Sequence, residues 1–222
     1  MDHKFRYYLK RLSLLILTLV PLSMNAQRGE AYRSEFEGRL GASVGVDLFD
    51  KTLGIKFSPE VRSNGLEYDK TLLKLSLDYD LFDVVKVGVA GRVTFNKTKK
   101  GVKQYGRFNL DLSRSFAVQK LRIKPRVRYA IYTGETNNFD LMRYELALGY
   151  KYKKKALFEP ELSAELFQSL RDGLMHAVRI TAGGDFRLSK GNKIGLYYHV
   201  QPQFEYRHLT HCLKLTYKFS FN

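Results

Sequence analysis

The sequence predicts an all-β protein, a single antiparallel transmembrane β-barrel of about 10 to 12 strands, with twelve preferred. Apolar and polar residues alternate with a period of two through most of the chain after residue 35. The alternating segments are long, and the N-terminus has the composition of an export signal. Because successive side chains of a strand point to opposite faces, this period gives each strand one apolar face and one polar face.

Eleven segments show the alternation, and none shows the period of an amphipathic helix. In the first segment, Phe36, Leu40 and Val44 share one face, whereas Glu37 and Arg39 share the other. Nine of the eleven segments contain 9 to 13 residues, which suits a tilted membrane strand of roughly 9 to 11 residues better than a soluble strand of roughly 5 to 6. The segments are residues 36–48, 53–62, 73–79, 85–95, 107–112, 121–131, 142–152, 158–166, 178–188, 193–202 and 213–221.

Short and longer connections alternate along the chain, as in bacterial barrels with short periplasmic turns and longer outer loops. The shorter set is 50–52, 80–83, 113–118, 153–155 and 189–192, and the longer set is 63–70, 96–103, 133–140, 169–175 and 204–210. With eleven strands, this order places the start of the mature chain on the outer side. We therefore expect either a short twelfth strand within residues 27–35 or one segment that is not a wall strand.

Four prolines, Pro59, Pro125, Pro160 and Pro202, fall inside predicted strands. Proline has no N–H to donate to a neighbouring strand, and a closed barrel has no free edge at which this loss is harmless. We therefore expect β-bulges at some of these positions.

Residues 1–26 have the three parts of a cleaved secretory signal peptide. A basic head with Lys4, Arg6 and Lys10 precedes an apolar run over residues 12–22, and Ala26 precedes the expected cut. The run is shorter than the roughly 20 residues that a membrane-spanning helix needs. The prediction is a signal peptide over residues 1–26 and one barrel domain over residues 27–222, located in the outer membrane of a Gram-negative bacterium.

The chain is strongly basic, with 38 Lys and Arg against 22 Asp and Glu and a net charge of +16. Such a balance suggests nucleic acid, anionic lipid or an acidic ligand as partner, and export argues against nucleic acid. The expected partners are outer-membrane lipid and a small anionic solute. Cys212 is the only cysteine, so an intrachain disulfide is excluded and an unpaired wall residue is the simplest interpretation.

Alternation alone does not decide which face points inward. A soluble lipocalin-like barrel has its apolar face inside, and a membrane barrel has it outside. Strand length favours the membrane barrel, as do the 15 Tyr and 15 Phe residues, many of them near strand ends. The chain also closes on an amphipathic strand with Phe219 and Phe221, which resembles the terminal aromatic strand of outer-membrane barrels.

If the polar face lines the lumen, its charges need partners, because a narrow barrel interior is poorly hydrated. A basic ladder on one strand and an acidic ladder two strands further on could meet across about 10 Å. The functional interpretation is a charged constriction or anion site, and the favoured alternative is a structural salt-bridge stack. The predicted charge network is Arg122, Lys124, Arg126, Arg128, Arg143, Glu145, Glu159, Glu161, Glu165 and Arg179.

No residue pattern defines catalysis, a cofactor site or a metal site. His199 lies on the polar face, and a hydrogen-bonded lumen histidine is favoured over a catalytic base. His208, His211 and Cys212 are too closely spaced, without a fourth ligand, for a convincing metal site. The GxSxG string at residues 41–45 lies inside a strand rather than on the strand-to-helix turn that a nucleophile elbow needs.

Four runs resemble domain of unknown function family 2490, a family of predicted outer-membrane barrels frequent in Bacteroidetes. They are Arg126-Val127-Arg128-Tyr129, Arg143-Tyr144-Glu145-Leu146, residues 159–167 and Leu196-Tyr197-Tyr198-His199-Val200-Gln201. The resemblance would cover most of the mature chain, although the expected N-terminal Trp is missing. It implies a barrel of unknown activity and adds no catalytic residue.

Three function classes stay open, and a non-enzymatic barrel is favoured. The first is a structural or passive-transport barrel with a basic-biased lumen. The second is a binding or adhesion module that uses the outer loops. The third is a barrel enzyme acting on lipid through His199 or the His208 and His211 rim.

Overall fold

A computed structural model describes residues 33–50, 52–81, 85–133, 140–151, 156–205 and 207–221. Residues 33–222 form one compact unit, and the predicted signal peptide, residues 1–26, lies outside the described residues. Among the described residues, no helix is long and apolar enough to cross a membrane.

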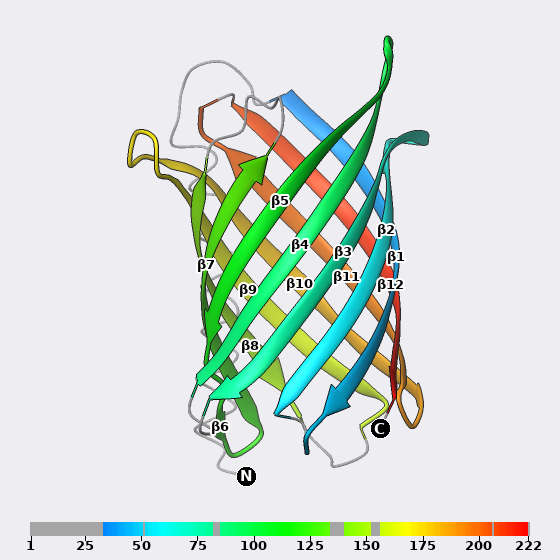
Figure 1. The fold of residues 1–222 in the computed structure, drawn as a ribbon, viewed down its shortest axis with the longest axis vertical. Coiled ribbons are helices and arrows are strands. Elements are labelled where there is room, and N and C mark those ends of the chain that lie inside the picture. Colours follow the sequence, from blue (N-terminus) through cyan, green and yellow to red (C-terminus); the bar gives the residue numbers. More distant parts are fainter. Residues whose placement is uncertain are drawn as a thin grey trace, which may run out of the picture. The chain divides into compact units, whose positions relative to one another are not determined.

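Every regular element in the described part of the chain is a β-strand, which confirms the all-β prediction. The strands follow the predicted alternating segments and extend most of them (Figure 1). They are β1 (Arg33–Leu48), β2 (Leu53–Asn64), β3 (Glu67–Leu81), β4 (Val85–Thr98), β5 (Gly101–Ser113), β6 (Phe116–Val118), β7 (Leu121–Thr133), β8 (Leu141–Tyr150), β9 (Phe158–Ser169), β10 (Met175–Ser189), β11 (Asn192–Gln203) and β12 (His208–Phe221).

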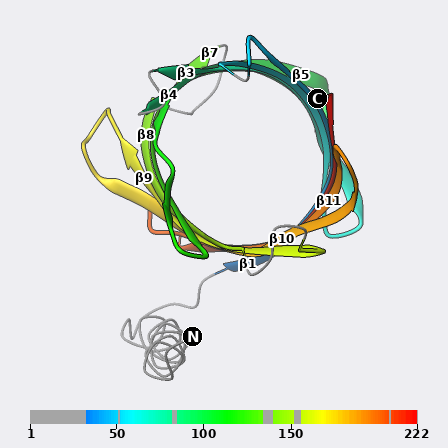
Figure 2. The ribbon, with the colours of Figure 1, turned by 90° about the horizontal axis from the view of Figure 1, so that it is seen from below.

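Eleven of the twelve strands form a closed barrel, seen end-on in Figure 2. Neighbours in sequence pair antiparallel around the ring, and β5 pairs with β7 directly. The short strand β6 pairs only with β7 and stands outside the ring. The ring closes where β1 pairs with β12 in parallel register, from Arg33 opposite His208 to Val46 opposite Phe221.

The total of twelve strands is the preferred count, but its distribution differs from the expectation. The short extra strand is β6, within a connection that the sequence assigned as a turn, and β1 begins at Arg33. The wall therefore has an odd number of strands, and the prediction of a purely antiparallel barrel fails at one ladder. When an odd number of strands alternates in direction, the first and last strands run the same way, so they can close the ring only in parallel.

The predicted longer connections are shorter than expected at two hairpins. Residues 65–66 join β2 to β3, and residues 99–100 join β4 to β5, because the strands continue to the turn. Gly65 adopts φ 59° at the first of these turns, a backbone conformation that glycine accepts most easily. The start of β1 lies at the same end of the barrel, since the Arg33 N–H donates to the Arg207 carbonyl at 3.0 Å.

Three of the four strand prolines lie at interruptions of a hydrogen-bonded ladder and Pro160 lies beside the end of one, and none of the four lies at a β-bulge. Each stays in regular register with one neighbouring strand, as Pro59 does opposite Leu73. Pairing with the other neighbour is interrupted around Pro59 and Pro202 without any change of register, and Pro125 lies where the β5 ladder ends and the β6 ladder begins. A proline removes one donor on one side only, so the opposite ladder is left intact.

The apolar face of the wall points outward and the charged face points inward. The outward side chains Leu40, Leu75 and Leu112 are 61%, 53% and 53% exposed, whereas Arg128, Arg143 and Glu165 are buried in the interior. A lipocalin-like barrel needs the reverse arrangement.

Two adjacent glycines on β10 allow close packing against the neighbouring strands. A Cβ at Gly183 would meet the Leu196 carbonyl oxygen and come within 2.7 Å of the Tyr197 Cα, both of them backbone atoms. We expect Gly183→Ala to destabilise the barrel by about 1–3 kcal/mol, because the backbone must shift to accept a methyl group. Urea unfolding of the refolded protein measures this. Gly91→Ala is the matched control, since nothing lies within 4 Å of the added Cβ, and an equal loss in both variants would contradict the packing argument.

Candidate functional site

The candidate site is the charged interior of the barrel, which we call the lumen. A cavity of about 780 Å³ occupies it and is lined by residues from all eleven ring strands. Among the described residues, twelve Lys and Arg and five Glu line this cavity. A second cavity of about 300 Å³, lined by Asp80, Lys86, Arg122 and Lys124 among others, shares Glu161 with the first. Glu161 therefore stands between the two spaces.

Glu165 on β9 is the centre of the largest group of contacts in the lumen. Its carboxylate lies 2.7 Å from Arg143, 3.4 Å from Arg179 and 3.7 Å from Arg126. Its side chain is 6% exposed. The register explains the arrangement, because Glu145 and Arg179 are the cross-strand partners of Glu165 on either side. One carboxylate thus offsets part of the charge of three guanidinium groups.

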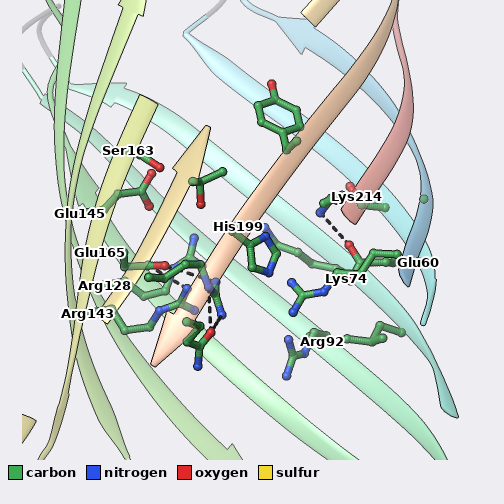
Figure 3. A pocket seen from close by; sticks show the side chains of 18 of the residues that line it. Glu60, Lys74, Arg92, Arg128, Arg143, Glu145, Ser163, Glu165, His199 and Lys214 are labelled. Carbon is green, nitrogen blue, oxygen red and sulfur yellow. Dashed lines mark hydrogen bonds and ion pairs between the residues drawn. The ribbon is translucent and has the colours of Figure 1, made fainter. Parts of the chain in front are cut away.

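The ion pairs around Glu165 continue across the wall. Arg126 on β7 also pairs with its cross-strand partner Glu145 on β8. On the other side, the Arg179 guanidinium donates to the Gln201 side-chain carbonyl at 2.5 and 2.9 Å. Figure 3 shows Glu145, Glu165 and Arg143 gathered on one side of the cavity.

The partner of Arg128 is a residue that the sequence analysis missed. Arg128 donates to both carboxylate oxygens of Asp111, at 2.5 and 2.8 Å, and its cross-strand partner on β8 is the like-charged Arg143. Asp111 was visible as an inward residue of the segment 107–112. Its pairing with Arg128 depends on β5 lying beside β7, whereas the predicted acidic partners are on β9, on the other side of β7.

The remaining predicted residues lie toward the other end of the lumen. Arg122 lies 3.7 Å from Glu161, whereas Glu159 does not contact the basic ladder of β7. Glu159 instead binds Arg187 at 2.9 Å and Lys193 at 3.1 Å. Lys124 lines the second cavity and forms no ion pair with any residue in the described ranges. The structure therefore brings together Arg126, Arg143, Glu145, Glu165 and Arg179, and it separates Glu159 and Lys124 from them.

A second charge cluster lies beside the parallel seam and has no counterpart in the sequence analysis. Glu60 on β2 binds Arg62 at 2.7 Å and reaches over β1 to Lys214 on β12 at 2.6 Å; the latter contact is dashed in Figure 3. Glu37 binds Arg39 at 2.9 Å and lies 3.3 Å from Arg62. The β2–β1–β12 neighbourhood exists only because the ring closes, so the sequence pattern of single strands could not reveal it.

His199 lies in the lumen without the companions that catalysis needs. It is 4% exposed, and its Nε2 atom has no hydrogen-bond partner among the described residues. Its cross-strand partner is Cys212, which is fully buried and does not line the cavity. No carboxylate in the described part of the chain orients the ring, so the nucleophile–base–orienting-group arrangement of covalent catalysis is not assembled there.

His208 and His211 lie in surroundings that differ from those of His199. His208 binds Glu35 at 2.9 Å, and the Nδ1 atom of His211 lies 2.6 Å from the Tyr198 hydroxyl. His211 and Cys212 are adjacent on a strand and face opposite sides of the wall. Within the described ranges, no group of three His, Cys, Asp or Glu side chains is placed to hold a metal ion.

The hairpin between β9 and β10 and the connection between β11 and β12 are linked at the barrel end. His176 Nδ1 lies 2.8 Å from Glu205, and its Nε2 lies 3.4 Å from Asp172. The Leu174 backbone N–H donates to Asp172 at 2.9 Å, which lowers the pKa of that carboxyl. These contacts link the two connections to each other.

The fold and the lumen define a closed β-barrel with an apolar outer wall and a basic interior. The chain belongs to DUF2490, a family of proteins of unknown function, whose model matches residues 39–208. This match confirms the resemblance carried by the four runs between residues 126 and 201. No curated protein and no solved structure matches the chain.

Proposed function

We propose that the protein is an outer-membrane barrel through which small anions pass without energy input. The observation that carries this proposal is a cavity lined by twelve Lys and Arg and only five Glu among the described residues, inside a wall whose apolar face is exposed. The membrane location and the preference for anions rest on different observations.

The outer wall of the barrel supports the proposed location in a membrane. The ring strands contain 10 to 16 residues, enough for the roughly 9 to 11 residues of a tilted membrane strand. Exposed Leu, Val, Phe or Tyr side chains lie on the outward face of every ring strand from β1 to β5. A soluble monomer rarely exposes apolar patches larger than a few hundred Å², because apolar surface in contact with water is unfavourable. Contact with lipid removes this unfavourable exposure. The predicted signal peptide and the aromatic last strand are consistent with export to that site.

The charges that line the lumen support the proposal that the transported solutes are anions. An excess of fixed positive charge in a narrow, partly desolvated passage raises the local concentration of anions and repels cations. The ion pairs around Glu165 and Glu60 leave several lumen cations without a carboxylate, among them Lys56 and Lys124, which form no ion pair within the described part of the chain. These cations can act on a passing ion.

We expect the purified barrel in a planar bilayer to conduct chloride in preference to potassium. Lys56→Glu together with Lys124→Glu should lower the chloride-to-potassium permeability ratio by about threefold or more, because two lumen charges change sign. The reversal potential in a salt gradient measures this ratio. Lys190→Glu is the matched control, since Lys190 lies in the exposed turn between β10 and β11. A cation-selective current, or the absence of current after repeated insertion, would overturn the proposed transport.

A further inference from the structure

A row of three cationic side chains and one tyrosine crosses four neighbouring strands of the lumen wall. Lys74 on β3 pairs in register with Arg92 on β4, Arg92 with Arg107 on β5, and Arg107 with Tyr132 on β7. All four line the large cavity. Figure 3 shows Arg92 reaching into the cavity on the side away from Arg143. We call these four residues the cationic row.

Uncharged residues surround the cationic row along its strands. The inward neighbours of Lys74, Arg92 and Arg107 on the same strands are Leu72, Ser76, Ala90, Thr94, Tyr105 and Asn109. On β2, the cross-strand partner of Lys74 is Ser58. On β5, the nearest inward carboxylate is Asp111, toward the C-terminal end of the strand, and Arg128 already occupies both of its oxygens.

The arginines of the row differ from the other inward-facing arginines. Arg92 and Arg107 form no ion pair with any described residue. Their Nε atoms are buried without a hydrogen-bond partner in that part of the chain, as are those of Arg126, Arg143 and Arg187. In contrast, carboxylates pair with the inward-facing arginines Arg39, Arg62, Arg122, Arg126, Arg128, Arg143, Arg179 and Arg187.

Within the described part of the chain, the charges that act on Arg92 are mainly positive, and the carboxylate that acts on Lys74 is Asp111, which is already paired with Arg128. The positive charges that act on Arg92 are those of Arg107, Arg62 and Arg143. The contact that Arg107 does make is with Tyr132, whose hydroxyl accepts from the guanidinium at 3.4 Å. Like charges placed directly opposite each other on neighbouring strands destabilise a sheet. An anion bound between them would remove this repulsion and satisfy the free donors.

We infer that the cationic row is a binding site for a phosphate group. Adjacent guanidinium groups offer paired N–H donors that match the oxygens of a tetrahedral oxyanion. Lys74 adds a third positive charge about one strand spacing away, roughly 5 Å, and the Tyr132 hydroxyl adds a neutral donor. Two negative charges suit this site better than one, so phosphate should bind more tightly than chloride or a monocarboxylate. The inference deepens the proposed anion passage and rests on it for access to the lumen.

The test uses inorganic phosphate as a blocker of the chloride current through the barrel in a planar bilayer. We expect phosphate to reduce the current, and the half-blocking concentration to rise about tenfold or more in Arg92→Gln and in Arg107→Gln, because each variant loses charge-assisted hydrogen bonds. Arg92→Lys should keep the chloride selectivity and still weaken the block, since lysine keeps the charge without the paired donors. Acetate should not block.

Arg187→Gln is the matched control, because Arg187 faces inward but pairs with Glu159 and lines neither cavity. Block by phosphate that is unchanged in Arg92→Gln and Arg107→Gln, or equally weakened in Arg187→Gln, would overturn the site. Glycerol phosphate, tested in parallel, distinguishes free phosphate from a phosphorylated solute, and block by either supports the shared chemistry.

A second readout separates the site from the proposed transport. ³¹P NMR of the detergent-solubilised barrel measures phosphate binding without any current. If the wild type conducts no chloride but binds phosphate, and Arg92→Gln loses the binding, the transport proposal fails while the site stands. If the wild type conducts chloride and neither method detects phosphate, the site fails and the transport proposal stands.

Discussion

Glu165→Gln is expected to lower the free energy of unfolding of the barrel by about 3–5 kcal/mol, the cost of removing one partner from a buried ion pair. The glutamine has the same shape, so the loss comes from charge and not from packing. Three guanidinium groups, those of Arg126, Arg143 and Arg179, share the Glu165 carboxylate. Without it, Arg143 has no carboxylate partner left within the described part of the chain.

Urea unfolding of the barrel refolded in detergent or lipid vesicles measures this change, and the mobility shift between boiled and unboiled samples gives a second readout. Glu67→Gln is the matched control, since Glu67 is exposed at the start of β3 and forms no ion pair in the described ranges. Its expected change is within about 0.5 kcal/mol. Equal stability of Glu165→Gln and wild type would show that the Glu165 contacts contribute nothing net to stability.

Leu75→Arg tests whether the outer wall meets lipid, with an expected loss of about 2–4 kcal/mol of folding free energy in lipid vesicles. Leu75 lies near the middle of β3 and its side chain points outward, 53% exposed. A charge at the middle of a membrane has no water to solvate it, and the loss falls toward zero near the interfaces. In a water-exposed wall the same substitution would be almost neutral.

Leu66→Arg provides the matched control because Leu66 is fully exposed in the hairpin between β2 and β3. The same chemical change there lies beyond the wall and should alter the unfolding free energy by no more than about 0.5 kcal/mol. A small and equal effect at both positions would count against the lipid-facing wall. The lumen charges and the phosphate site would then belong to a barrel in water.

The sequence alone was sufficient for the strands and their faces. Each of the eleven alternating segments became a strand of the ring, and residues such as Leu75 and Lys74 lie on the predicted sides. This succeeds because the strand period is local: a side chain's face is fixed by its neighbours in sequence. The same local pattern identified the inward residues that surround Glu165.

The sequence pattern did not show which charged residues on different strands of the ring pair with each other. The sequence placed Arg128 near the acidic ladder of β9, whereas the register pairs it with Asp111 on β5. It left the strand parity open, and the structure settled it with the parallel seam of β1 and β12.

The sequence by itself determined that this chain forms a barrel with an apolar face and a basic face, because those properties repeat every two residues along one strand. The tertiary structure decided which cations receive a carboxylate and which do not. The cationic row of Lys74, Arg92, Arg107 and Tyr132 exists only through the register of four strands. Register places residues far apart in sequence side by side, so the alternation within one strand shows the face of each charge but not the charge it meets on the next strand.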